Sequence, residues 1–520
     1  MDRSSPKTYR WAAEGDLNAF FALMLDNMLN LVVLAAILKA FGYPSEHISR
    51  LMIPGTALGV LVGDAVYTWL AVRLARRTGK EDVTAMPLGL DTPSTIGIAV
   101  VVLGPVWLQT QDAVLTWQVG MATMVCIGLV KVVFSFAGDW IRRTVPDAGL
   151  LGSLGGVGLA LLAFLPLFHI FSAPVVGLTA LGLVLYSLVS RQRMPWGVPG
   201  AFAAVAVGTA LWHALGPAGL LGAPYHGVSC EFPVSLPSPT LGFLKGFSRA
   251  LDYLPVAIPF GLLTIVGGIN VTESAKLAGD DYETRDILLT EAAATLAAGL
   301  FGGVSQSTPY IGHPAYKAMG ARAAYTLATG VFIGLGGCLG YVQFIVDLIP
   351  AAAVTPILLF IGLEIISQAY HECPKEQSPA VSLSFLPCVA ELVRIVVTGN
   401  LHVGAAMLAT LPAAMAAEAA HSLKIVELLG HGFILTAMLW GAAEAHLIRR
   451  ENYRSAAYLL LCAVFASFGL IHSAAATGGL YWPWNAPDPL VHHFVAGYAA
   501  MAALLWALGR GPNPRKGLKA

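Results

Sequence analysis

The chain has 520 residues, of which 56% are hydrophobic and 12% charged, and its mean hydropathy is +0.70. A soluble domain carries about 25% charged residues, so this composition excludes an ordinary water-soluble protein. The 30 basic residues equal the 30 acidic ones, which gives no indication of a nucleic-acid partner. Continuous apolar stretches of about 20 residues recur along the chain, and they predict membrane-spanning helices rather than a β-barrel.

Sixteen spans are predicted, with both termini in the cytoplasm of a bacterial-type inner membrane. Under this orientation the basic residues of the short loops, such as Arg77, Lys80, Arg142 and Arg143, lie on the cytoplasmic side. The apolar stretch 403–420 is treated as re-entrant, because counting it as a span would reverse the charge bias of the C-terminal part. The spans lie near 17–40, 50–73, 87–109, 113–137, 148–170, 173–190, 197–215, 250–272, 285–303, 308–320, 323–346, 350–370, 378–398, 428–447, 454–474 and 490–508.

Two polar interruptions, 84–95 and 305–316, occupy matching places in the two halves of the chain. Prolines and glycines in each forbid a regular helix there. Seven spans separate the matching pieces, so the halves have opposite topology, and paired interruptions of this kind indicate a transporter's binding site. The predicted parts are a cytoplasmic segment 1–16, a first inverted repeat 17–215 with spans 1–7, an extracytoplasmic loop 216–249, a second inverted repeat 250–450 with spans 8–14, and additional C-terminal helices with a cytoplasmic tail, 451–520.

Three segments carry a resemblance to a known family: Met86–Pro93, Ser307–His313 and Ile349–Gly362. They resemble the starts of the third, tenth and twelfth spans of the uracil/xanthine permease superfamily, and most closely its guanine/hypoxanthine permease-like branch. The resemblance covers roughly residues 17–450. It implies an all-α fold of seven plus seven inverted helices in core and gate domains, with short β-strands at the broken third and tenth spans and two extra C-terminal helices.

The same resemblance implies ion-coupled uptake of a nucleobase, with H+ or Na+ as the coupling ion, and a homodimer. One departure concerns the two carboxylates that the family uses to bind bases. The first position falls between Thr264 and Gly268, where this chain has no acid, and the second falls at Gly312. Both base-binding carboxylates are therefore missing.

Polar residues on the first span and at the first interruption are candidates for the site. Asp26 and Asn30 share a helix face, with Asn27 beside them. A carboxylate flanked by amides suits a cation or a solute that donates hydrogen bonds, although a polar clamp between helices explains the same residues. Asp91 and Thr92 open a half-helix, where Asp91 acts as a cap, a substrate contact or both.

The second interruption holds the densest polar cluster in an apolar context. Ser307 and Thr308 can bond the edges of a planar heterocycle, and Tyr310 can stack on it. His313 titrates near neutral pH and is a substitute for the missing acid, or else an ordinary satisfied polar residue. The predicted substrate-binding residues are Asp26, Asn27, Asn30, Asp91, Thr92, Thr264, Asn270, Ser307, Thr308, Tyr310 and His313.

Proton or ion coupling is assigned to Glu273, His313 and Asp26. Glu273 can accept a proton if it faces the core, whereas a solvated or gating position is the other interpretation. The six cysteines are scattered without metal-ligand spacing, so neither a metal site nor a cofactor is predicted.

The main functional prediction is a secondary-active permease that imports a nucleobase or similar heterocycle. The alternative with the same fold is an anion transporter for sulfate or carboxylates. The missing carboxylates favour this alternative, but the core spans show no obvious Lys or Arg. An integral membrane enzyme is the least favoured, because no nucleophile–base pair is visible.

Overall fold

The computed structural model describes all but a few short stretches of the chain. Three parts of the sequence analysis lie outside the described residues: the basic residues Arg142 and Arg143, the first half of the stretch 403–420, and the C-terminal tail. The described residues are 9–136, 145–192, 194–195, 198–225, 227–228, 232–310, 312–398, 412–475 and 478–510.

The chain divides into two compact units, one of Met1–Ile141 with Leu165–Phe360 and one of Arg142–Phe164 with Ile361–Ala520. The elements of the first unit are α1 (Gly15–Ala40), α2 (Ser45–His47), α3 (Ile53–Thr78), β1 (Leu88–Leu90), α4 (Thr92–Ile98), α5 (Gly104–Thr110), α6 (Ala113–Ser135), α9 (Leu165–Ser172), α10 (Pro174–Val184), α11 (Gly200–Leu215), α12 (Phe243–Ala250), α13 (Leu254–Leu277), α14 (Thr284–Leu300), β2 (Ser307–Pro309), α15 (His313–Ala318), α16 (Ala324–Leu339), α17 (Tyr341–Leu348) and the start of α18 (Ala351–Glu372). Those of the second are α8 (Asp147–Val157), the rest of α18, α19 (Ser378–Thr398), α21 (Ala413–Gly430), α22 (Phe433–Ile448), α23 (Asn452–Ser467) and α24 (Leu490–Gly509).

The predicted fold class is confirmed: the chain is a multi-pass helical membrane protein with short strands at two broken spans. Within the described ranges, nine helices are long and apolar enough to cross a membrane, or up to eleven if two bent helix pairs are each counted as one span. Sixteen were expected. Part of the difference lies in helices such as Pro174–Val189 and Gly200–Leu215, which are apolar but shorter than a full span.

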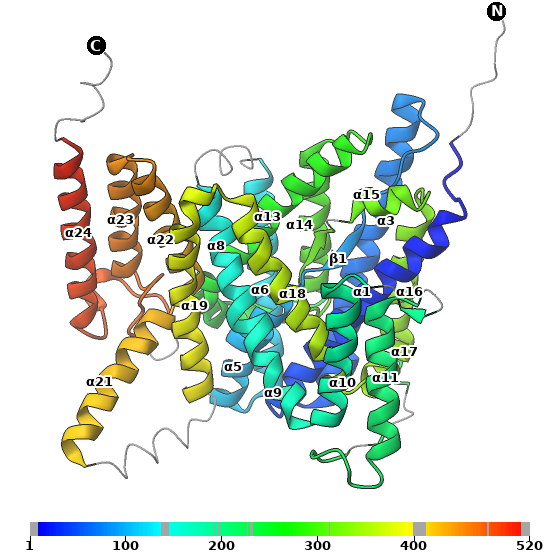
Figure 1. Ribbon diagram of the computed structural model, residues 1–520, viewed down its shortest axis with the longest axis horizontal. Coiled ribbons are helices and arrows are strands. Elements are labelled where there is room, and N and C mark those ends of the chain that lie inside the picture. The colour runs from blue at the N-terminus through cyan, green and yellow to red at the C-terminus, as the bar shows by residue number, and fades with distance from the viewer. Residues whose placement is uncertain are drawn as a thin grey trace, which may run out of the picture. The chain divides into compact units, whose positions relative to one another are not determined.

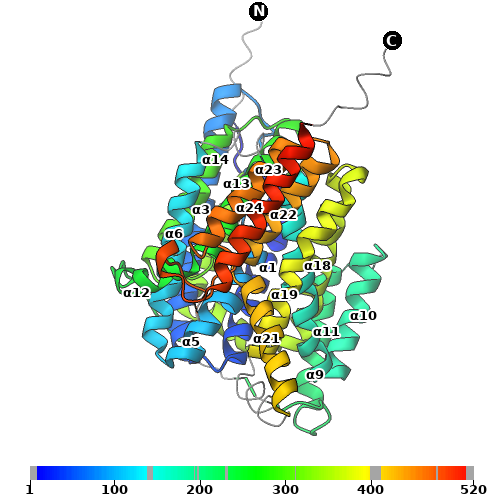
Figure 2. The same ribbon diagram turned by 90° about the vertical axis from the view of Figure 1, so that its left-hand side faces the viewer.

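The second unit contains the two additional C-terminal helices. α23 packs against α24 and also against α22, so that the three lie side by side (Figure 1, Figure 2). Before them, α21 and α22 form one of the bent pairs, at 75°. The described part of the stretch predicted to be re-entrant is therefore helical from Ala413 onward.

Glycines bring α3 close to two neighbouring helices in the first unit. On one face Gly55, Gly59 and Gly63 follow one another at every fourth position, and a Cβ added at Gly55 would lie 2.3 Å from the Gly303 nitrogen. On another face, Gly330 of α16 leaves a Cβ position only 2.8 Å from the Asp64 Cβ. Small residues at this spacing let membrane helices approach backbone to backbone. We call these two sets of contacts the glycine faces of α3. The first set is with α14 and the loop that follows it, and the second is with α16.

Candidate functional site

The two interrupted segments meet in space, as the sequence predicts. β1 and β2 pair antiparallel, with Leu88 opposite Pro309 and Leu90 opposite Ser307. The pairing extends beyond the strands, because the Asp91 nitrogen donates to the Gln306 oxygen at 3.0 Å. Antiparallel pairing is what two halves of opposite topology produce. We call this pairing, with the helix starts beside it, the strand crossing.

Asn27 holds β1 against α1 and has a structural role. Its Oδ1 accepts from the Leu90 nitrogen at 3.0 Å, and its Nδ2 donates to the Leu88 oxygen at 3.4 Å. The side chain is fully buried. The amide therefore satisfies backbone groups of β1 on the side away from β2, where a sheet of two strands leaves them unpaired.

Replacing Asn27 with leucine is expected to lower the free energy of unfolding by about 1–3 kcal/mol, because buried backbone groups of Leu88 and Leu90 lose their partner. SDS-induced unfolding in mixed micelles measures the loss. Asn27→Asp serves as the comparison: it keeps an acceptor for the Leu90 nitrogen, replaces the amide donor with a carboxyl oxygen and places a second acid beside Asp26. If the leucine variant is as stable as the parent, the hydrogen bonds of Asn27 to Leu88 and Leu90 do not contribute to stability.

Asp26 and Asn30 lie one helical turn apart on α1, and both retain an unused acceptor. Tyr310 donates its hydroxyl to Asp26 Oδ1 at 3.0 Å, whereas Asp26 Oδ2 is buried without a hydrogen-bond partner. Asn30 Nδ2 donates to the Asp26 backbone oxygen at 3.1 Å, and Asn30 Oδ1 is likewise buried and unpartnered. Buried acceptors without donors are rare in native structures, so this helix face is suited to receive a proton, a cation or a donor of the solute.

Asp91 caps the helix that follows β1. Its Oδ2 accepts from the Ser94 nitrogen at 3.0 Å and from Gln306 Nε2 at 3.2 Å. The cap begins a helical stretch of 19 residues, Thr92–Thr110, whose first side chain is buried. The capping interpretation is therefore confirmed, and Asp91 additionally joins the two interruptions through Gln306.

Residues of the second interruption divide between the strand crossing and a separate cluster. The Ser307 hydroxyl is buried without a partner, and Thr308 is half-buried opposite Gly89. His313 points elsewhere: its Nε2 lies 3.2 Å from Asp280 Oδ2 and 3.2 Å from the Thr84 oxygen. Its partner is thus an acid that the sequence analysis did not consider.

Asp280 is the centre of this cluster, in the turn between α13 and α14. Besides His313, it accepts from Lys317 Nζ at 2.6 Å and from the Thr84 nitrogen at 3.1 Å. Burial alone would raise the pKa of Asp280. The hydrogen bonds outweigh burial, so the pKa of this carboxyl lies below its ordinary value.

Since the folded state lowers the pKa of Asp280, its contribution to stability is complete above the unfolded pKa of about 4. It is lost as the pH falls through the folded value. Asp280→Asn is expected to lower the free energy of unfolding by about 1.5–3 kcal/mol at pH 7. The gap between parent and variant should narrow below about pH 4, as followed by unfolding at several pH values. A gap independent of pH would contradict this assignment.

Three further predicted residues lie on α13 and do not join the cluster of unpartnered groups at α1. The buried Thr264 hydroxyl donates to carbonyls of its own helix at 3.1–3.2 Å. Asn270 and Glu273 are exposed on the surface of the helix. Their assignment to substrate binding and proton coupling remains a prediction, without support from the geometry of the strand crossing.

A buried ion pair lies directly behind β2, and the sequence analysis missed it. Lys131 of α6 and Glu291 of α14 are both fully buried, and Nζ lies 2.6 Å from Glu291 Oε1. The ammonium also donates to the Ser307 backbone oxygen at 2.9 Å. The expectation that the core spans lack a basic residue is therefore wrong. A lone Lys in a predicted span was the signal that could have identified this pair.

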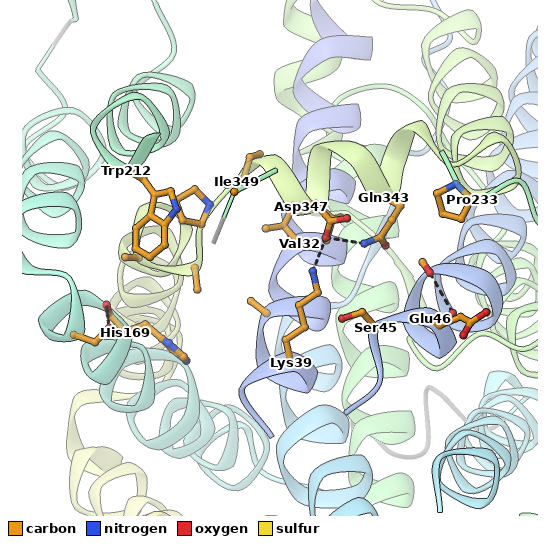
Figure 3. A pocket seen from close by; sticks show the side chains of 18 of the residues that line it. Val32, Lys39, Ser45, Glu46, His169, Trp212, Pro233, Gln343, Asp347 and Ile349 are labelled. Atoms are coloured by element: carbon orange, nitrogen blue, oxygen red, sulfur yellow. Dashed lines mark hydrogen bonds and ion pairs between the residues drawn. The ribbon is translucent and has the colours of Figure 1, made fainter. Parts of the chain in front are cut away.

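A cavity of about 740 Å³ opens at the C-terminal end of α1 (Figure 3). Val32 and Ala36 line it from α1, so it begins shortly after Asn30 along the helix. At its wall Lys39 donates to Asp347 Oδ1 at 2.5 Å, and Gln343 Nε2 donates to the same oxygen at 2.9 Å. The Asp280 cluster lies at the opposite end of α1, where Asp16 accepts from the Arg322 nitrogen at 2.9 Å. The cavity therefore lies at the end of α1 that is away from the Asp280 cluster, and its wall includes Val32, two positions after Asn30.

Comparisons with known proteins concern the fold. No protein-family model matches the sequence, and no curated protein does. Among solved structures, the transmembrane domain of a cyanobacterial bicarbonate transporter, BicA, matches with a TM-score of 0.49 and 17% identity, over 68% of this chain and 89% of that one. SLC26A9 matches with a TM-score of 0.45 and 11% identity, over 73% of this chain and 66% of that one. The murine Slc26a9 anion transporter in the inward-facing state matches with a TM-score of 0.44 and 13% identity, over 73% and 68%.

These comparisons correct the family suggested by the sequence motifs. The reported structures are bicarbonate and anion transporters, which belong to a different family from the uracil/xanthine permeases. The motifs that suggested a nucleobase permease surround the strand crossing. Motifs at a broken span do not by themselves identify the substrate, because one fold serves many functions.

Proposed function

We propose that the chain is a secondary-active transporter of a small anion, bound at the strand crossing. One observation carries the proposal. A buried ammonium, that of Lys131, lies against β2, whereas neither of the two positions at which nucleobase permeases place a carboxylate offers an unpaired one here. Gly312 has no side chain, and the carboxylate that the described part of the chain places beside Gly268 is that of Glu291, which pairs with Lys131. At these two positions a nucleobase would find no free acid for its N–H groups. The unpartnered carboxylate oxygen beside β1 belongs to Asp26 of α1, which we assign to the proton.

The anion is held by backbone groups. The capped helix Thr92–Thr110 directs its N-terminus at the strand crossing, and helix N-termini stabilise negative charge. Lys131 offsets the charge of Glu291, so that the acid does not repel an anion. Bicarbonate, sulfate and small carboxylates are the solutes to test first, and bicarbonate is the solute named for one of the similar structures.

Asp26 takes up the coupling proton. Asp26 Oδ2 and Asn30 Oδ1 are both unpartnered acceptors on one face of α1. A proton on Oδ2 turns this buried acceptor into a donor, and it removes a negative charge from the helix that lines the cavity. Uptake of an anion with a proton therefore suits this geometry. We further propose an inner-membrane location with cytoplasmic termini and a homodimeric state.

Purified protein in proteoliposomes tests the function. We expect saturable uptake of labelled bicarbonate, sulfate or succinate that is faster with an inwardly directed proton gradient. Hypoxanthine and uracil are measured in parallel with the same vesicles. Saturable uptake of a base and none of the anions would overturn the proposal.

Replacing Asp26 with asparagine is expected to slow proton-driven uptake at least about tenfold, while anion exchange without a gradient persists, because asparagine mimics the protonated acid. The pH dependence of uptake should flatten in this variant. Tyr310→Phe is the matched control, since it removes the donor to Asp26 and leaves the carboxyl in place. An Asp26→Asn variant with the pH profile of the parent would exclude Asp26 as the proton site.

A further inference from the structure

The oxygen atoms around the Lys131 ammonium resemble the ligand set of an alkali cation. Nζ lies 2.6 Å from Glu291 Oε1, 2.9 Å from the Ser307 backbone oxygen and 3.3 Å from Thr295 Oγ1. These are a carboxylate, a carbonyl and a hydroxyl oxygen, which are the groups that hard cations prefer. An ammonium has three N–H donors, and each finds one oxygen. We call this arrangement the oxygen cradle.

The residues of the oxygen cradle carry more oxygen acceptors than the ammonium contacts. Glu291 Oε2 and Ser307 Oγ are both buried without a hydrogen-bond partner. Glu291 Oε2 faces α13, since a Cβ added at Gly268 would lie 3.2 Å from it. A metal ion coordinates more oxygens than the three that one ammonium reaches, so the site has the ligand surplus of a cation site rather than the minimum of an ion pair.

The position of the oxygen cradle links it to the strand crossing. Ser307 is the residue of β2 that pairs with Leu90 of β1. Its carbonyl oxygen accepts a hydrogen bond from the ammonium of Lys131, a residue of α6. A positive charge at this point therefore fixes β2 against α6 and α14 and offsets the buried carboxylate of Glu291.

We propose that Lys131 is a tethered substitute for a dissolved monovalent cation: its ammonium fills a cation site between α6, α14 and β2. The chain consequently needs no Na+ at this point. Removal of the lysine side chain leaves a negatively charged oxygen cradle that free Na+, or an alkylammonium of the missing length, occupies. This inference does not depend on which solute is transported, because it concerns the stability of the purified chain.

The test uses the thermal unfolding of purified full-length Lys131→Ala in detergent. The protein is titrated with NaCl, KCl or propylammonium chloride, with choline chloride keeping the ionic strength constant. Propylammonium supplies the four heavy atoms that alanine lacks. We expect the parent to unfold at the same temperature in every salt. The variant should unfold several degrees lower in choline and recover saturably with Na+ or propylammonium.

Two controls decide the interpretation. Lys131→Ala combined with Glu291→Gln removes the charge of the oxygen cradle and should lose the cation response. Lys39→Ala breaks the partly exposed pair with Asp347, and it should show no saturable recovery. If the double variant recovers as the single one does, or if Lys39→Ala recovers equally, the proposal is wrong.

If Lys131→Ala yields no folded protein in choline, the test moves to membranes solubilised in NaCl or in choline chloride, analysed by size-exclusion chromatography. Lys131→Gln, which keeps most of the side chain's length, is run beside it. A monodisperse peak that appears only in NaCl supports the cation site. An equally poor profile in both salts for both variants overturns it. Uptake of anions plays no part in these measurements, so failure here leaves the proposed transport function to be judged separately.

Discussion

Replacing Glu291 with leucine is expected to lower the free energy of unfolding by about 3–5 kcal/mol, because it leaves the Lys131 ammonium buried without its counter-charge. Both side chains are fully buried, and Nζ lies 2.6 Å from Glu291 Oε1. The Ser307 carbonyl and the Thr295 hydroxyl remain as partners of the ammonium, but neither carries a charge. SDS-induced unfolding in mixed micelles measures the loss.

A double-mutant cycle separates the pair from the loss of packing. Lys131→Met combined with Glu291→Leu removes both charges, and replacing a buried ion pair with apolar side chains is often neutral. The double variant should therefore be more stable than Glu291→Leu. Glu283→Gln is the exposed control: its pair with Arg77, at 3.5 Å and more than half exposed on both sides, should contribute less than about 1 kcal/mol. Strict additivity of the two buried substitutions would show that the charges do not interact.

The second large effect is expected for Gly55→Ala. The new Cβ would lie 2.3 Å from the Gly303 nitrogen and 2.4 Å from the Phe301 oxygen, which are backbone atoms and cannot turn aside. Overpacking of this kind costs about 1–3 kcal/mol, sometimes more, and it exceeds the gain of about 0.5–1 kcal/mol from alanine in a helix. The neighbouring Thr56 hydroxyl accepts a hydrogen bond from the Val304 nitrogen at 3.2 Å. The loop that the new Cβ would displace leads directly into β2, so we expect uptake to fall together with stability.

Gly267→Ala provides the matched control for this prediction. This glycine also lies within a long helix, α13, but nothing comes within 4 Å of its Cβ position. The substitution should be neutral or slightly stabilising. Equal unfolding free energies for the Gly55 and Gly267 variants would contradict the prediction. They would show that the loop after α14 moves away from the new Cβ at little cost in free energy.

The features that could be predicted from the sequence are those that depend on local chemistry. Proline and glycine interrupt a helix wherever they occur, so the two broken spans and their pairing could be expected. Asp91 stands before Thr-Pro-Ser at a helix start, and its capping bond to the Ser94 nitrogen follows from that pattern. The substrate could not be inferred in the same way, since the motifs that suggested a nucleobase surround the broken spans and one fold serves many functions.

The features that could not be predicted depend on contacts between distant segments. Lys131 and Glu291 are separated by 160 positions, and neither lies in a recognisable motif. Their pairing requires that α6 pack against α14, which helical periodicity does not reveal in spans that are apolar all round. The same reason applies to His313: the sequence places it at the second interruption, but only the fold shows that the turn after α13 brings Asp280 to its ring.

The glycine faces of α3 have a mechanical consequence. At Gly55, Gly59 and Gly330 the nearest atoms are backbone or Cβ atoms, which do not move when a side chain changes rotamer. These contacts therefore resist sliding of α3 along α14 and α16. In the proposed transport cycle we therefore expect α3, α14 and α16 to move as one block. Spin labels placed on α3 and α16 should accordingly keep the same separation in every step of the cycle.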